Sequence, residues 1–204
     1  MPDRTPGPDA PAPAQRGKRA DAQRNYEHLL GVARTVVQEQ GTEASLRDIA
    51  RRSGVGLGTL YRHFPTRDAL LEALLRQGFD RLAAEAAALA ASDDPDAALT
   101  AWLRAFTLGA GTFHGLSGSL MATLADEQSP LHASCLEMRE AAGRLLRRAQ
   151  DSGSIRRDID GIDLFALVNA LSWIADQAPS LNARREQHFR LIMDGLRAPG
   201  AGQH

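Results

Sequence analysis

The chain has 204 residues, which is enough for one or two small domains with a buried core. Its 43% hydrophobic and 24% charged residues are ordinary for a globular protein, and its single cysteine, Cys135, excludes an internal disulfide framework. Because no apolar run has the length of a membrane span and no signal peptide opens the chain, we expect a soluble, cytoplasmic protein with no membrane partner.

The net charge of −1 conceals an uneven distribution of charge. Between residues 16 and 67 there are ten Lys or Arg against five Asp or Glu, and from residue 68 onward there are 13 against 18. A basic first third joined to an acidic remainder predicts that only the first part meets a polyanion.

The first helix is expected after a tail that is rich in proline. Five of the ten prolines lie in residues 1–15, so we predict a disordered tail there. A helix is predicted to start near Ala20, because Tyr26, Leu30 and Val37 recur at helical spacing, and to end at Gly41.

Two short helices are expected next. Ser45 and Asp48 have capping-box spacing at the start of one helix, which Gly54 ends. Another short helix is expected over Leu57–His63, because Pro65 prevents its continuation.

The remaining pattern is also helical. A longer helix follows a cap at Thr66, and Asp94-Pro95 and Ser129-Pro130 each read as a cap followed by an N1 proline. Glycines over 109–118 predict a break. The last helices are expected over 131–150, 160–176 and 182–196. The sequence therefore predicts an all-α fold of about nine helices, with a helix-turn-helix domain at 16–65 and a helical ligand-binding and dimerisation domain at 66–204.

The segment from Ser45 to Phe64 has the pattern of a helix-turn-helix. Two short helices flank a tight turn, and Val55 and Leu60 are apolar where the motif needs buried contacts. The second helix can then enter a major groove of double-stranded DNA with its first residues toward the base edges.

This segment closely resembles the DNA-binding domain of the tetracycline-repressor (TetR) family. The resemblance covers residues 20–71 and includes the run Thr-Leu-Tyr-Arg-His-Phe at 59–64 and Asp-Ala-Leu-Leu at 68–71. It implies DNA contacts for Arg47, Gly56, Leu57, Gly58, Thr59, Tyr61, His63 and Arg67. Many members have a polar residue where this chain has Gly56 and a lysine where it has Arg67, whose forked guanidinium also binds phosphate.

An N-terminal arm is a further candidate for DNA contact. Its basic residues, which could lie on phosphates or in a minor groove, are Arg16, Lys18, Arg19 and Arg24. The alternative is a solvated basic face. Tyr61 could likewise be a core residue, and we expect Phe64 to be one.

The second domain gathers large aromatic and thioether side chains that suit an apolar ligand pocket. The candidates are Trp102, Phe106, Phe113, His114, Met121, Leu124, Met138 and Trp173. The alternative for each is a place in an ordinary core without a ligand.

The last two long helices are candidates for a homodimer interface. Residues 162–176 are apolar nearly all round, so this helix needs cover on two sides, and residues 182–196 carry one apolar stripe. The expected interface residues are Leu164, Leu167, Val168, Leu171, Phe189, Ile192, Met193 and Leu196. A large monomeric core is the alternative.

Three functional classes follow from these observations. The leading one is a homodimeric repressor that binds a near-palindromic operator and is released by a small apolar or amphipathic effector. A DNA-binding protein without an effector is the second. An enzyme built on Cys135, His114, His132 and Asp126 is the third, but no catalytic, cofactor or metal motif supports it, so we expect no cofactor and no catalytic residues.

Overall fold

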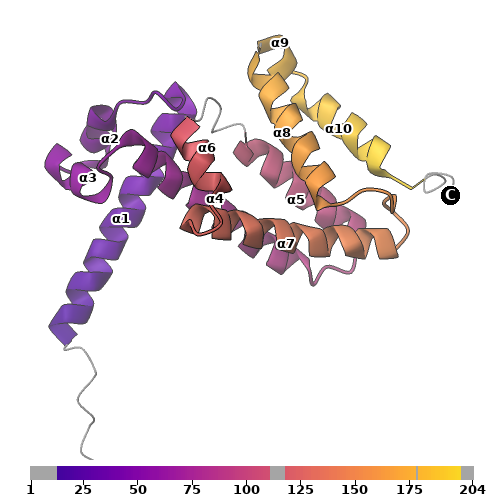
Figure 1. The fold of residues 1–204 in the computed structure, drawn as a ribbon, viewed down its shortest axis with the longest axis horizontal. Helices are drawn as coiled ribbons and strands as arrows, with labels where there is room; N and C mark the ends of the chain where they lie inside the picture. Colours follow the sequence, from indigo (N-terminus) through magenta and orange to yellow (C-terminus); the bar gives the residue numbers. More distant parts are fainter. Residues whose placement is uncertain (1–12, 111–117, 178, 199–204) are drawn as a thin grey trace, which may run out of the picture.

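In a computed structural model (Figure 1), described for residues 13–110, 118–177 and 179–198, the chain forms ten helices and no β-strand within those ranges. The helices are α1 (Pro13–Gln40), α2 (Leu46–Ser53), α3 (Leu57–His63), α4 (Arg67–Leu89), α5 (Pro95–Ala110), α6 (Gly118–Ala125), α7 (Pro130–Asp151), α8 (Gly161–Gln177), α9 (Pro179–Asn182) and α10 (Arg185–Leu196). The predicted all-α class is confirmed. The tenth helix is the four-residue α9, which is too short to leave a periodic pattern.

The first helix begins earlier than predicted. The helix α1 starts at Pro13 instead of near Ala20, inside the segment that was expected to be a tail. Proline has no free N–H to lose in the first turn of a helix, and alanines and arginines with good helix propensity follow it.

The caps of the short helices mostly follow the sequence. Ser45 Oγ accepts the N–H of Asp48 at 3.4 Å, and Gly54 ends α2 at φ 70°, in the left-handed region that favours glycine. A full capping box would also have the carboxylate of Asp48 accept the backbone N–H of Ser45. The carboxylate of Asp48 instead binds Arg51 and Arg52. The turn between α2 and α3 is thus set by the left-handed backbone of Gly54, whereas the ion pairs of Asp48 lie within α2.

Two hydrophobic cores share one helix. The first core packs α1, α2 and α3 onto the start of α4, around Ile49 and Leu60, both of which are fully buried. The second core packs the rest of α4 against α5, α7, α8 and α10. The helix α4 therefore joins the first core, which carries the helix-turn-helix, to the second core. We call α1, α2, α3 and the start of α4 the DNA-reading end.

Specific contacts fix the second core. Helices α4 and α7 lie along each other in the centre of the molecule (Figure 1). Trp102 is buried between them and donates its indole N–H to the carbonyl of Leu82 at 2.8 Å. The N–H of Arg156 donates to Leu196 O at 2.9 Å, which ties the end of α10 to the loop before α8. None of the described helices is long and apolar enough to cross a membrane.

Candidate functional site

One face of α3 is buried and the other is free, as a reading helix requires. Leu60 and Phe64 lie in the first core, whereas Gly58, Thr59 and Tyr61 are exposed. The tyrosine keeps 46% of its surface accessible, so its aromatic ring is not a core element. These side chains can reach phosphate oxygens and base edges without unfolding the motif.

The N-terminus of α3 has no side-chain cap. Gly56 holds the N-cap position in an extended conformation and forms no side-chain hydrogen bond there. A Cβ added at Gly56 would meet only Thr59 Oγ1, at 3.9 Å, so the backbone tolerates a larger residue. Leu57 is half-buried against the first core, and Arg47 is exposed at the start of α2. The first turn of α3 therefore offers mainly backbone and Thr59 to a groove.

His63 is held by aromatic contacts. Its ring lies 5.7 Å from that of Tyr26 on α1 and 6.2 Å from that of Phe64, measured between centroids. The histidine is nevertheless exposed. The packing orients the imidazole on the reading face at the C-terminal end of α3.

Most arginines of the DNA-reading end are paired with carboxylates. Arg67 lies 2.5 Å from Glu43, and Arg52 lies 2.6 Å from Glu39. Arg51 and Arg52 both contact Asp48, at 2.5 and 2.9 Å. The hydrogen bond from Arg51, together with the charges of both arginines, lowers the pKa of Asp48. A phosphate contact by Arg67 must therefore compete with Glu43.

Arg62 is a candidate that the sequence analysis did not single out. It is exposed on the last turn of α3, one turn after Thr59, and the described part of the chain gives it no ion pair. The signal was its spacing of three residues from Thr59, which places both side chains on neighbouring positions of the helix.

The N-terminal arm is described only in part. Arg24 is exposed and pairs with Asp21, which is also exposed. Arg16, Lys18 and Arg19 lie on the first turns of α1, and their side chains are outside the described part of the structure. Their contact with DNA stays a prediction.

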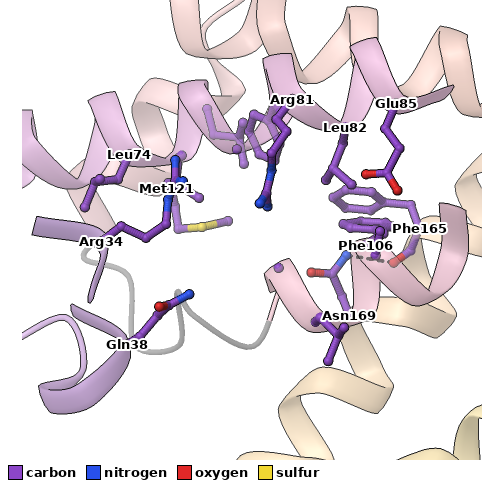
Figure 2. Close-up of a pocket in the computed structure, with 17 residues that line it drawn as sticks. Arg34, Gln38, Leu74, Arg81, Leu82, Glu85, Phe106, Met121, Phe165 and Asn169 are labelled. Carbon is purple, nitrogen blue, oxygen red and sulfur yellow. Dashed lines mark hydrogen bonds between the residues drawn. The ribbon is translucent and has the colours of Figure 1, made fainter. Parts of the chain in front are cut away.

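A cavity of about 530 Å³ opens between the DNA-reading end and the helical bundle (Figure 2). It is within the size range of small-molecule sites. Its walls come from α1, α4, α5, α6 and α8, and its apolar lining consists of Leu74, Leu75, Phe79, Leu82, Ala105, Phe106, Leu108, Met121, Leu124 and Phe165. Leu108 is 61% exposed and Met121 is 50% exposed, so the cavity leaves large apolar surface uncovered.

Three of the predicted pocket residues line this cavity, namely Phe106, Met121 and Leu124. Trp102 and Met138 do not, because they are almost fully buried in the second core around a void of only about 10 Å³. Trp173 is 58% exposed on α8 and does not line the cavity. Phe113 and His114 lie outside the described residues. Helical spacing could not separate a core wall from a cavity wall, because both are apolar.

The polar groups of the cavity were missed by the sequence analysis. They are Arg34 and Gln38 from α1, Arg81 and Glu85 from α4, and Asn169 from α8. Burial lowers the pKa of Arg34, and the positive charge of Arg81 lowers it further. No motif marks these residues, since they come together only when three helices pack.

The expected dimer interface needs correction. The protomer's own core buries Leu164, Val168, Leu171, Phe189, Met193 and Leu196. Ile192 is half-buried, and only Leu167 of the predicted set is exposed. The large apolar side chains left uncovered on α8 and α10 are Ile162, Leu167, Trp173, Ile174 and Leu191. The sequence showed that α8 is apolar on two sides but not which side faces the bundle.

The imagined nucleophile site does not form among the described residues. Burial raises the pKa of the Cys135 thiol, which disfavours the reactive thiolate. The ring of His132 contacts the carbonyl of Leu124 at 3.0 Å. His114 lies outside the described residues, and no three potential metal ligands cluster within them.

Comparison with known proteins agrees with this two-part geometry. Residues 29–74 match the family model for bacterial regulatory proteins of the tetR family, and residues 94–198 match that for the SbtR-like transcriptional regulator C-terminal domain. The chain belongs to the TetR family. The first match covers the helix-turn-helix with the end of α1 and the start of α4, and the second runs from the cap of α5 to the end of α10.

Related proteins of this family span nearly the whole chain. The crystal structure of the TetR transcriptional regulator SCO0520 from Streptomyces coelicolor is 37% identical, with 85% of this chain and 99% of that one covered at a TM-score of 0.67. A TetR transcription regulatory protein from Mycobacterium vanbaalenii is 32% identical, with 88% and 99% covered and a TM-score of 0.61. The HTH-type transcriptional repressor KstR2 of Rhodococcus jostii is 27% identical over 96% of this chain and 98% of its own length. TetR-family proteins are regulators of transcription and not enzymes.

Proposed function

We propose that this TetR-family regulator is a homodimeric repressor that leaves its operator when a small amphipathic effector occupies the cavity of Figure 2. The observation that carries the proposal is the composition of the cavity wall. Arg34 and Gln38 come from α1 of the DNA-reading end, and the other walls come from the helical bundle. A ligand there touches both parts of the molecule at once.

DNA recognition uses α2, α3 and the first residue of α4. Thr59, Tyr61, His63 and Arg67 contact phosphates, with Arg47 and Arg62 at the two ends of the reading surface. In a dimer, two copies of α3 enter successive major grooves about 34–36 Å apart, which requires a near-palindromic operator.

The dimer forms through the exposed apolar faces of α8 and α10. Leu167, Trp173 and Ile174 are uncovered on α8, and Leu191 is uncovered on α10. These two helices lie side by side at the edge of the bundle (Figure 1). A second copy would give the four-helix, isologous interface that covers all four residues.

Release follows from a difference in ligand affinity between two conformations. The effector favours a state in which the two copies of α3 are no longer spaced for the half-sites, because it binds that state more tightly. The shared helix α4 carries the change, since its first half supports α3 and its second half lines the cavity.

The deciding experiment is footprinting on the DNA upstream of the protein's own gene. We expect protection of a near-palindrome, and loss of protection when an effector from a small-molecule panel is added. Protection that no compound relieves, together with no thermal stabilisation by any of them, would leave a DNA-binding protein without an effector. Absence of protection on any upstream DNA contradicts the proposal as a whole.

The oligomeric state is tested by sedimentation equilibrium. The wild-type chain should sediment at twice its 22.0 kDa mass, and Leu167→Glu should sediment as a monomer with unchanged helix content. As a control, Leu136→Glu, at another exposed leucine on α7, should leave the dimer intact. A wild-type monomer at operator-binding concentrations contradicts the dimer.

A further inference from the structure

Two arginines face the same cavity from different parts of the molecule. Arg34 extends from α1 and Arg81 from α4, and both point into the space in Figure 2. Arg81 Nη2 lies near the C-terminal end of α5, 3.7 Å from where a Cβ would stand on Gly109. The two guanidinium groups are close enough for Arg81 to lower the pKa of Arg34.

No carboxylate balances the charges of these two arginines within the described residues. Within the described residues, neither arginine forms a salt bridge, and Arg34 Nη2 donates a hydrogen bond to Gln77 Oε1 at 2.6 Å. Glu85 is the only acidic residue on the described cavity wall. Figure 2 shows it toward Phe106 and Phe165, away from Arg34. Like charges beside an apolar, partly desolvated wall are unfavourable until an anion lies between them.

The apolar half of the cavity complements the basic half. Phe106 and Phe165 lie 5.6 Å apart between centroids at the opposite end, and Leu82 lies beside them. A ligand that satisfies both halves has an anionic group at one end and an apolar body at the other. A neutral ligand forms no ion pair with the arginines, and a small inorganic anion leaves the apolar wall exposed to water.

We propose that the effector is an amphipathic organic anion, such as a carboxylate with an apolar body, whose charged group bridges Arg34 and Arg81 while its body lies against Phe106 and Phe165. The inference deepens the proposed function and rests on the same cavity. It adds the chemical class of the effector and two residues that select it.

The same bridge explains how occupancy reaches the DNA-reading end. Arg34 lies on α1, whose neighbours Ala33, Val36 and Val37 belong to the first core with α2 and α3. An anion held by both arginines replaces repulsion between α1 and α4 with attraction. It also competes with Gln77 for Arg34. Both effects change how α1 sits against α4, and therefore the spacing of the reading helices in a dimer.

Calorimetry on the full chain without DNA tests the ligand class. The probes are decanoate, 1-decanol and acetate, which separate the anion with an apolar body from the body alone and from the charge alone. We expect decanoate to bind with a Kd below about 1 mM and at least tenfold more tightly than the other two. No binding of decanoate, or equal binding of decanoate and decanol, overturns the proposal.

Substitutions test the two residues. Arg34→Gln and Arg81→Gln should each weaken decanoate about tenfold or more and leave decanol unchanged. Arg76→Gln, also on α4 but outside the cavity wall, is the matched control and should bind like wild type. Unchanged decanoate affinity in both cavity variants overturns the assignment. If a Gln variant loses helix content, Arg81→Lys is measured instead. This variant keeps the positive charge and should retain most of the decanoate affinity.

A DNA measurement separates this inference from the proposed function. If decanoate binds through both arginines but operator DNA stays bound, the ligand class stands and the release mechanism is overturned. If another compound releases the DNA while decanoate does not bind, repression with an effector stands and the anionic class is overturned.

Discussion

The DNA-reading end and the cavity use arginine in opposite ways. At the reading end Arg51, Arg52 and Arg67 each contact a carboxylate within 2.6 Å. In the cavity Arg34 and Arg81 face each other, and the described residues offer them no ion pair. Paired surface arginines contribute little to stability but hold defined positions. Arginines in a partly desolvated wall that lack a carboxylate partner among the described residues suit the proposed role of binding an anionic ligand.

The difference suggests that the two regions respond differently to salt and to ligand. If the arginines of the DNA-reading end bind phosphate as proposed, their carboxylate partners compete with that phosphate and reduce nonspecific attraction to DNA. Among the described residues, no carboxylate pairs with Arg34 or Arg81 in the cavity, and Glu85 lies toward Phe106 and Phe165. Stability, DNA affinity and pH response each test one part of this contrast.

The largest expected effect is on the free energy of unfolding, through the two cores that α4 joins. Leu60→Ala should cost about 2–5 kcal/mol of unfolding free energy, and Trp102→Ala about 3–5 kcal/mol, because both side chains are almost fully buried. Chemical denaturation followed by circular dichroism measures both. A single transition in both variants indicates that α4 couples the cores; two separated transitions break that link.

The second effect is on DNA affinity. Arg67→Ala should weaken binding to all sequences by about tenfold and reduce the salt dependence by about one phosphate contact. Titration of operator and unrelated DNA at several salt concentrations gives both quantities. Arg76→Ala serves as the control away from the reading face. Equal salt slopes for wild type and Arg67→Ala would show that this arginine serves Glu43 alone.

A smaller effect on DNA affinity is expected from substitution of Glu43, the ion-pair partner of Arg67. Glu43→Gln removes the carboxylate that lies 2.5 Å from Arg67, so the arginine is free for phosphate and a negative charge leaves the DNA face. Operator affinity should rise by a factor of about two to five at low salt and less at high salt. Weaker binding in this variant would mean that Glu43 positions Arg67 for DNA and does not compete for it.

The smallest effect is the pH response of α2. The pKa of Asp48 is held below its usual value first by the hydrogen bond from Arg51. A depressed pKa in the folded state adds stability above the unfolded-state pKa, and that stability is lost as pH falls through the folded-state value. Asp48→Asn should therefore melt lower than wild type near neutral pH, and the gap should close in acid. If the difference in melting temperature between wild type and Asp48→Asn does not change with pH, Asp48 does not stabilise the fold through its charge.

Local sequence chemistry predicted the elements well. The caps at Ser45, Thr66 and Ser129 and the glycine at 54 sit where they were expected, because each acts on backbone groups within a few residues. The exposure of Thr59 agrees with the DNA contact expected for it, and the 46% exposure of Tyr61 decides against the core position that the sequence left open. The start of α1 was placed too late because no apolar periodicity marks residues 13–20, where most residues other than Pro13 and Gly17 are good helix formers.

The sequence by itself determined the all-α class, the helix-turn-helix and the family, since periodicity, caps and a contiguous motif are local properties of the chain. Tertiary structure alone decided which apolar residues of α8 face the bundle and which stay exposed, because an all-round apolar helix has no preferred side. It alone brought Arg34 and Arg81 together across 47 positions of sequence and paired Arg67 with Glu43. The DNA-reading end could therefore be predicted from the sequence, whereas the cavity that is proposed to control it forms only when α1 packs against α4.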